Sequence, residues 1–131
     1  MIFVDTGAWF ASMVRGDANH AIAADWLAQN QEPLVTTDDI LSETITLLVM
    51  RGQRHVAEAF GMAIFGGKLA RLHTVTPDEV RVAWQVFLRF QDKHWSFVDC
   101  TSKVVMEKLG IQTAFSFDHH FRQFGSVQVV P

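Results

Sequence analysis

The sequence predicts an α/β fold with a mainly parallel central sheet of four to five strands flanked by helices. Short runs of β-branched and aromatic residues alternate along the chain with helical patterns of about 10–15 residues. Parallel strands need crossover connections of one hand, so this alternation favours a sheet covered by helices on both faces. The length of 131 residues suits a single domain over residues 1–131.

The N-terminal half alternates between apolar runs and helical periodicity. Residues 2–4 are a β-prone apolar run, and residues 8–14 continue as a first helix. Asp17 is the expected N-cap of a second helix that reaches residue 29. Further elements are predicted at residues 34–36 (strand), 37–51 (helix), 53–65 (helix) and 69–75 (strand), with a glycine stop signal after each of these two helices.

The C-terminal half contains the most explicit helix start in the chain. Thr76 is the expected N-cap and Glu79 completes a capping box, for a helix that reaches residue 90. After a polar turn, residues 97–98 are expected to end a short strand that runs into Asp99, and Asp99 is expected to open a helix that ends at a glycine. The last predicted elements are a strand at 112–117, a short helix at 118–124 and a strand at 127–130.

Composition and charge narrow the function classes. The chain has 11 basic and 14 acidic residues, a formal net charge of −3, so it is not a polycation that binds nucleic acid nonspecifically. Its 49% hydrophobic content predicts apolar surface available for a partner. The single cysteine, Cys100, excludes an intrachain disulfide and predicts a reducing, cytoplasmic location. We expect neither a secretory leader nor a membrane-spanning segment.

Three acids follow apolar runs and precede helical segments: Asp5, Asp99 and Asp118. Each has a structural interpretation as a helix cap, which stabilises a helix by about 1 kcal/mol. Acids that follow different parallel strands also share one edge of the sheet, where they can converge on a ligand. Glu43 lies in the middle of a predicted helix and has no cap role there, and its spacing fits either the sheet edge or solvent.

Convergence of these acids has a chemical consequence. Carboxylates that approach one another repel, and burying them ionised is costly unless a cation lies between them. Oxygen ligands without thiolates or a histidine pair favour Mg²⁺ or Mn²⁺ over Zn²⁺, and such ions act mainly on phosphoryl groups. The acids therefore predict metal-dependent phosphoryl chemistry.

The segments that carry these acids resemble a known family. In order, IFVDTGAWFA, DDILSETITLL, SFVDCTS and AFSFDHHF are similar to the acidic signatures of the PIN domain, and most similar to VapC-type toxins of bacterial toxin–antitoxin pairs. The likeness covers essentially the whole chain. It implies a parallel α/β sheet and an endoribonuclease that depends on Mg²⁺ or Mn²⁺. By position, it implies an acidic quartet around the metal, with Thr6 beside the first acid to orient a ligand or water; the quartet is Asp5, Glu43, Asp99 and Asp118.

The resemblance also implies a mechanism and partners. Metal-activated water would hydrolyse an RNA phosphodiester and leave a 5′-phosphate and a 3′-hydroxyl. A small cognate antitoxin of the VapB type would cover the N-terminal helices, and the toxin would form a homodimer or a larger complex. Gly7 stands where many relatives carry serine, and Lys103 stands where many carry an apolar or acidic residue.

Two other functions remain open from the sequence. A PIN-like interaction module without activity is disfavoured because all four acids are present. An α/β phosphohydrolase similar to haloacid dehalogenases would use Asp5 as a covalent nucleophile and needs a second acid two residues later, where this chain has Gly7. Of the adjacent His119 and His120, at most one can face the site, because neighbours on a helix diverge by about 100°.

Overall fold

The computed structural model describes residues 1–131 and contains a five-stranded sheet in which β1 is central. The order is β3-β2-β1-β4-β5, and every neighbouring pair is parallel. The strands are β1 (Ile2–Val4), β2 (Leu34–Thr37), β3 (Arg71–His73), β4 (Thr113–Phe115) and β5 (Gln128–Val130). The predicted α/β class and parallel sheet are confirmed.

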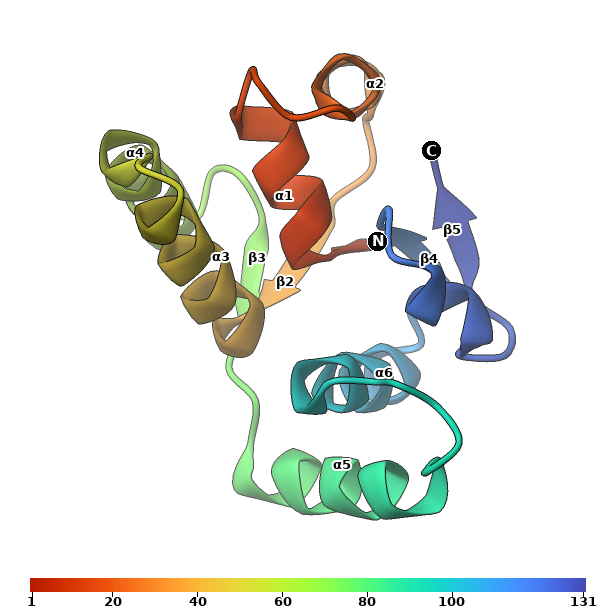
Figure 1. Ribbon diagram of the computed structural model, residues 1–131. Helices are drawn as coiled ribbons and strands as arrows, with labels where there is room; N and C mark the ends of the chain where they lie inside the picture. The colour runs from red at the N-terminus through yellow and green to blue at the C-terminus, as the bar shows by residue number, and fades with distance from the viewer.

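Six α-helices and one 3-10 helix connect these strands. They are α1 (Thr6–Met13), α2 (His20–Gln29), α3 (Asp38–Met50), α4 (Arg54–Phe65), α5 (Pro77–Arg89), α6 (Phe97–Leu109) and η1 (His119–Gln123). In Figure 1, α1 and α2 lie together above the sheet, whereas α5 and α6 form a pair below it. No helix has the length and apolar character that crossing a membrane requires.

The strand order creates a switch point beside β1. The chain first builds outward from β1 to β2 and β3, and then returns to place β4 and β5 on the other side of β1. The crossovers on the two sides diverge between β1 and β4, which leaves a crevice at the carboxyl ends of these two strands. Ligands of open α/β sheets bind at such a crevice.

The central strand is buried on both faces. Ile2, Phe3 and Val4 belong to one core cluster that also includes Trp9 of α1 and Phe115 of β4. The indole N–H of Trp9 donates to Thr36 Oγ1 at 3.3 Å, and this hydroxyl donates to the Val4 carbonyl at 3.3 Å. The polar groups of these buried residues are therefore satisfied where α1 packs on the sheet.

One predicted strand is wrong. Phe97 and Val98 form the first turn of α6, and Asp99 is the third residue of this helix instead of its first. The reason is a capping box that starts the helix at Ser96: the Ser96 hydroxyl accepts from the Asp99 N–H, and the Asp99 carboxylate accepts from the Ser96 N–H. Asp99 still reaches the sheet edge, because the N-terminus of α6 points there.

Other boundaries differ by a few residues. The strands expected at 69–75 and 112–117 are limited to Arg71–His73 and Thr113–Phe115, and the second helix starts at His20 instead of Asp17. The first helix begins at Thr6, directly after Asp5. The capping box at Thr76 is present as predicted. Strand ends depend on which partner strand is present, so local sequence defines them less well than it defines helix caps.

Candidate metal-binding active site

The predicted acids meet in one polar cavity at the switch point. The cavity has a volume of about 330 Å³, and no hydrophobic residue lines it. Its lining residues are Asp5, Thr6, Gly7, Glu43, His94, Ser96, Asp99, Asp118 and His120. All five residues that the sequence singled out for the site are therefore brought together, although they come from the end of β1, from α1, α3 and α6, and from the turn before η1.

Asp5 is the most deeply buried acid of this cavity. It occupies the N-cap position of α1, but its side chain makes no capping hydrogen bond, so the capping interpretation is wrong for this residue. Its Oδ2 accepts from the Ser116 hydroxyl at 3.1 Å. Burial, assisted by the nearby charges of Asp99 and Asp118, raises the pKa of Asp5 to about 7. The carboxylate is thus held in an environment that disfavours its charge unless a cation approaches.

Asp99 and Asp118 cap helices and line the cavity at the same time. Asp99 Oδ2 accepts from the Ser96 N–H at 2.9 Å, which completes the capping box of α6. Asp118 Oδ1 accepts from the His120 N–H at 2.9 Å and caps η1. The structural and the functional interpretations of these two acids therefore do not exclude each other.

The carboxylates share a pattern that suits a metal. Asp5 Oδ2, Asp99 Oδ2 and Asp118 Oδ1 are held by protein donors. The second oxygens of Asp99 and Asp118 have no hydrogen bond or ion pair with the protein, whereas Asp5 also has a hydrogen bond from the Thr6 backbone N–H. No lysine or arginine lines the cavity to neutralise these acids. Fixed carboxylates with oxygens left free are what a hard divalent cation requires, so the residues fit Mg²⁺ or Mn²⁺.

Glu43 and Thr6 complete the lining. Glu43 is exposed on α3, and its side chain has no partner within the protein; it lies at the cavity and not on a distant face. The Thr6 hydroxyl is buried without any hydrogen-bond partner. An unpaired buried hydroxyl costs about 1–3 kcal/mol, so its position beside the acids is consistent with a ligand or water that it would orient.

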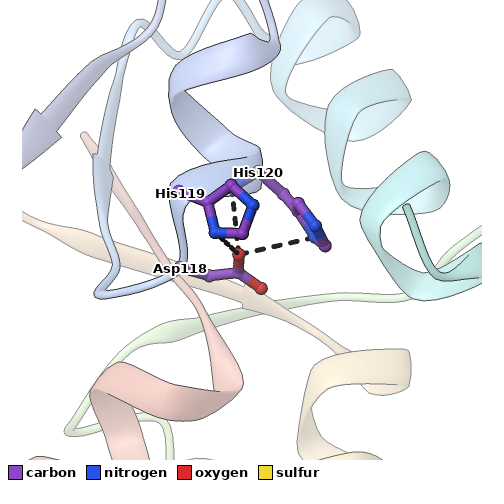
Figure 2. A group of neighbouring side chains, drawn as sticks. All are labelled: Asp118, His119 and His120. Atoms are coloured by element: carbon purple, nitrogen blue, oxygen red, sulfur yellow. Dashed lines mark hydrogen bonds and ion pairs between the residues drawn. The ribbon is translucent and has the colours of Figure 1, made fainter. Parts of the chain in front are cut away.

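The carboxylate oxygens of the four acids lie farther from one another than the ligand atoms that bind one ion directly. The group whose ligand atoms all lie within 4.8 Å of one another is Asp118, His119 and His120, shown in Figure 2. No three members of the acidic quartet meet the same limit. Mg²⁺ usually keeps several of its waters and binds proteins through one or two carboxylates, so such spacing suits an ion held partly through water.

The two adjacent histidines differ in exposure, as the sequence predicted. The His119 side chain is 76% exposed and lies outside the cavity, whereas the His120 side chain is 16% exposed and lines it.

Burial, with the charge of Asp99, raises the pKa of the Cys100 thiol. Cys100 is therefore a packed thiol and not a nucleophile.

Three lining or supporting residues were missed by the sequence analysis: His94, Ser96 and Ser116. The S-x-x-D spacing of Ser96 and Asp99 is a capping-box signal that was available. Ser116 accepts from the Asp118 N–H at 3.0 Å, a short-range turn that the S-x-D spacing also permits. Its bond to Asp5 spans 111 residues, and no local signal predicts it.

The fold and this cavity define a class: a parallel α/β domain with an acidic, metal-compatible site at its topological switch point. Comparison with known families matches residues 2–127 to the PIN domain. The chain is 40% identical over 131 residues to the "23S rRNA-specific endonuclease VapC20" of two Mycobacterium tuberculosis strains, CDC 1551 / Oshkosh and H37Rv. These matches cover 100% of this chain and 99% of each relative.

A solved structure agrees with these matches. The crystal structure of Mycobacterium tuberculosis VapC20, described as a sarcin–ricin loop cleaving toxin, superposes with a TM-score of 0.93 at 40% identity and 100% coverage of both chains. The chain belongs to the PIN domain family and is a VapC-type toxin, an endoribonuclease of a toxin–antitoxin system. This confirms the predicted family and function and excludes the dehalogenase-like alternative.

Proposed function

We propose that this chain hydrolyses a phosphodiester bond of ribosomal RNA with Mg²⁺ or Mn²⁺ in the acidic cavity. The observation that carries the proposal is that all four acids line one cavity without hydrophobic residues. The choice of ribosomal RNA, and of the sarcin–ricin loop within it, rests on the names of relatives that match over the whole chain.

The acids of the cavity would bind the divalent cation. The carboxylates of Asp5, Asp99 and Asp118 would hold the cation, with Glu43 contributing from α3. When bound, the ion supplies activation of water and neutralises charge on the leaving 3′-oxygen. Asp5, whose pKa is about 7 in the protein alone, would give up its proton as the cation arrives. The expected products carry a 5′-phosphate and a 3′-hydroxyl.

The position of Thr6 suggests a separate task. Its hydroxyl lies beside Asp5 and has no protein partner. A hydroxyl can donate to a phosphate oxygen or accept from water, so Thr6 would orient one of these groups against the acids.

The cleavage experiment uses purified full-length protein and an RNA stem–loop of the sarcin–ricin region. We expect cleavage with Mg²⁺ or Mn²⁺, no cleavage with excess chelator, and a loss of at least about 100-fold in Asp5→Asn and Asp99→Asn. Glu58→Gln is the matched control, because Glu58 is an exposed acid paired with Arg54 on α4, away from the cavity. Full activity of either aspartate variant would remove that residue from the mechanism, and cleavage of other RNAs alone would reject the ribosomal target.

The apolar surface supports the predicted partners. Several large hydrophobic side chains remain exposed in the N-terminal half, among them Ile22 of α2, Met50 of α3 and Met62 and Phe65 of α4. We propose that a small antitoxin of the VapB type covers part of this surface in the cytoplasm and that the toxin forms a homodimer or larger complex. Copurification from the native host tests this, and a clean monomer at micromolar concentration without a partner would contradict it.

A further inference from the structure

His120 is the side chain that contacts two acids of the cavity from one ring atom. Its Nδ1 lies 2.9 Å from Asp99 Oδ2 and 3.4 Å from Asp118 Oδ1. An ionised carboxylate only accepts hydrogen bonds, so Nδ1 carries the hydrogen and donates. The His120 backbone N–H also donates to Asp118 Oδ1, at 2.9 Å (Figure 2). One residue therefore joins an acid of α6 to the acid that precedes η1.

The core holds the His120 ring in this place. The next residue, Phe121, is completely buried, and its ring packs against Phe3 of β1 and Phe124, with centroid distances of 6.0 Å and 4.7 Å. This anchor fixes η1 with His120 on the cavity side and His119 toward solvent. The ring of His120 is thus positioned by packing as well as by its hydrogen bond.

The contacts of His120 leave one oxygen of each acid free. Asp99 Oδ2 accepts from both His120 and the Ser96 N–H, and Asp118 Oδ1 accepts from the His120 backbone. The remaining oxygens, Asp99 Oδ1 and Asp118 Oδ2, have no protein donor. A hydrogen bond to one oxygen of a metal-binding carboxylate orients the other oxygen toward the metal, and loss of such a bond typically lowers metal affinity by about 10- to 100-fold.

We propose that His120 is a positioning residue that sets the spacing between the free oxygens of Asp99 and Asp118, and thereby the affinity of the cavity for a divalent cation. The proposal rests on the proposed function in that this cavity holds Mg²⁺ or Mn²⁺. Nothing in the family comparison assigns His120 a role, and its neighbour His119 has the same chemistry without the bond to Asp99.

The test measures Mn²⁺ binding directly on the purified full-length chain, by the electron paramagnetic resonance signal of free Mn²⁺. We expect His120→Ala to weaken binding by about 10- to 100-fold. His120→Asn places an amide N–H near the position of Nδ1, so it should restore most of the affinity. His55→Ala is the matched control and should bind Mn²⁺ as the wild type does, because His55 is an exposed histidine of α4 that does not line the cavity.

A second readout separates positioning from folding. Thermal denaturation in chelator reports whether each variant is folded before any metal is added. If His120→Ala does not fold, His120→Gln replaces it: its longer amide reaches toward the place of Nε2, so we expect weak binding in His120→Gln and near-normal binding in His120→Asn.

Three results would overturn the inference. Unchanged Mn²⁺ binding without the ring would mean that His120 does not position the acids, and tighter binding would mean that His120 opposes the cation. Equal loss in His120→Asn and His120→Ala would mean that the ring contacts the ion directly instead of positioning the acids. Failure of the wild type to bind Mn²⁺ would reject the metal site itself, whereas wild-type binding with an insensitive His120 would reject this inference alone.

Discussion

Two regions of this protein each bury a carboxylate, with opposite consequences. Asp5 in the acidic cavity is 7% exposed, and Glu79 at the start of α5 is 2% exposed. Burial raises the pKa of Asp5 to about 7. Burial also acts to raise the pKa of Glu79, but hydrogen bonds from Thr76, His73 and Lys108 outweigh it and lower the pKa to about 2.

The difference lies in the donors that each acid finds. Glu79 Oε1 accepts from the Thr76 N–H at 2.8 Å and from His73 Nε2 at 2.9 Å, and Lys108 Nζ lies 3.1 Å from Oε2. Asp5 has the Ser116 hydroxyl on one oxygen and a hydrogen bond from the Thr6 backbone N–H, but no lysine or arginine beside it. A buried acid with its own cation stabilises the fold, whereas a buried acid without one is prepared for a cation that comes from outside.

We expect the largest effects from neutralising each of the two buried acids, Asp5 and Glu79. Asp5→Asn should reduce RNA cleavage by about 1000-fold while the fold remains as stable or becomes more stable, because the amide removes an unfavourable buried charge. Glu79→Gln should lower the free energy of unfolding by about 2 kcal/mol, because charge-assisted hydrogen bonds are lost, and should leave the cleavage rate of the folded protein unchanged. Denaturant unfolding and single-turnover cleavage on both variants measure this, and strong destabilisation by Asp5→Asn would end the distinction.

We expect a smaller effect on cleavage from removing a neutral group of the cavity, the hydroxyl of Thr6. Thr6→Val keeps the shape of the side chain and removes a hydroxyl that has no protein partner, so stability should not fall while cleavage drops about 10- to 100-fold. Ser102→Ala is the control, because the Ser102 hydroxyl is also buried and unpaired but does not line the cavity. If both variants keep full activity, an unpaired hydroxyl is no sign of function in this protein.

The last predictions concern pH. In chelator, folded Asp5 keeps its proton to about pH 7, whereas the unfolded chain loses it near the ordinary aspartate pKa of 3.8, so stability should fall as pH rises through this window. Folded Glu79 holds its charge down to about pH 2 against 4.5 in the unfolded chain, so stability should fall as pH drops through that window. Urea unfolding across pH, with Asp5→Asn and Glu79→Gln as the variants that each lack one slope, tests both signs.

Added Mg²⁺ should counteract the loss of stability only on the alkaline side. The cation binds the folded cavity and favours ionised Asp5, whereas it has no site at Glu79. The alkaline slope would therefore flatten with Mg²⁺ and the acidic slope would persist. An equal effect of Mg²⁺ on both slopes would mean that the ion acts nonspecifically.

Much of the fold was predictable because its signals are local. The capping box at Thr76, the glycine end of α6 and the apolar run of β1 each depend on a few consecutive residues. The misassigned strand at residues 97–98 shows the limit of this approach. Two apolar residues before an acid suit either a strand end or a helix start, and the Ser96 cap decided between them.

The sequence indicated acids for the site but not the hydrogen bonds that hold them. The resemblance to the PIN domain selected Asp5, Glu43, Asp99 and Asp118 as candidates, and all four line the cavity. The residues that hold them were not selected, since Ser116 reaches Asp5 across 111 positions and His120 reaches Asp99 across 21. Such contacts exist only after β4 has paired with β1 and η1 has docked on the core.

The sequence by itself determined the alternation of strands and helices, which follows from periodicity and capping chemistry, and it carried the resemblance to the PIN family from which the candidate acids were taken. Only the tertiary structure decided which oxygens of the acids are held and which are free. It also decided that Asp5 lacks a cation of its own while Glu79 pairs with Lys108, and that His120 rather than His119 faces the cavity. The physical reason is that burial and hydrogen-bond partners depend on which distant segments pack together, and the strand order sets that packing.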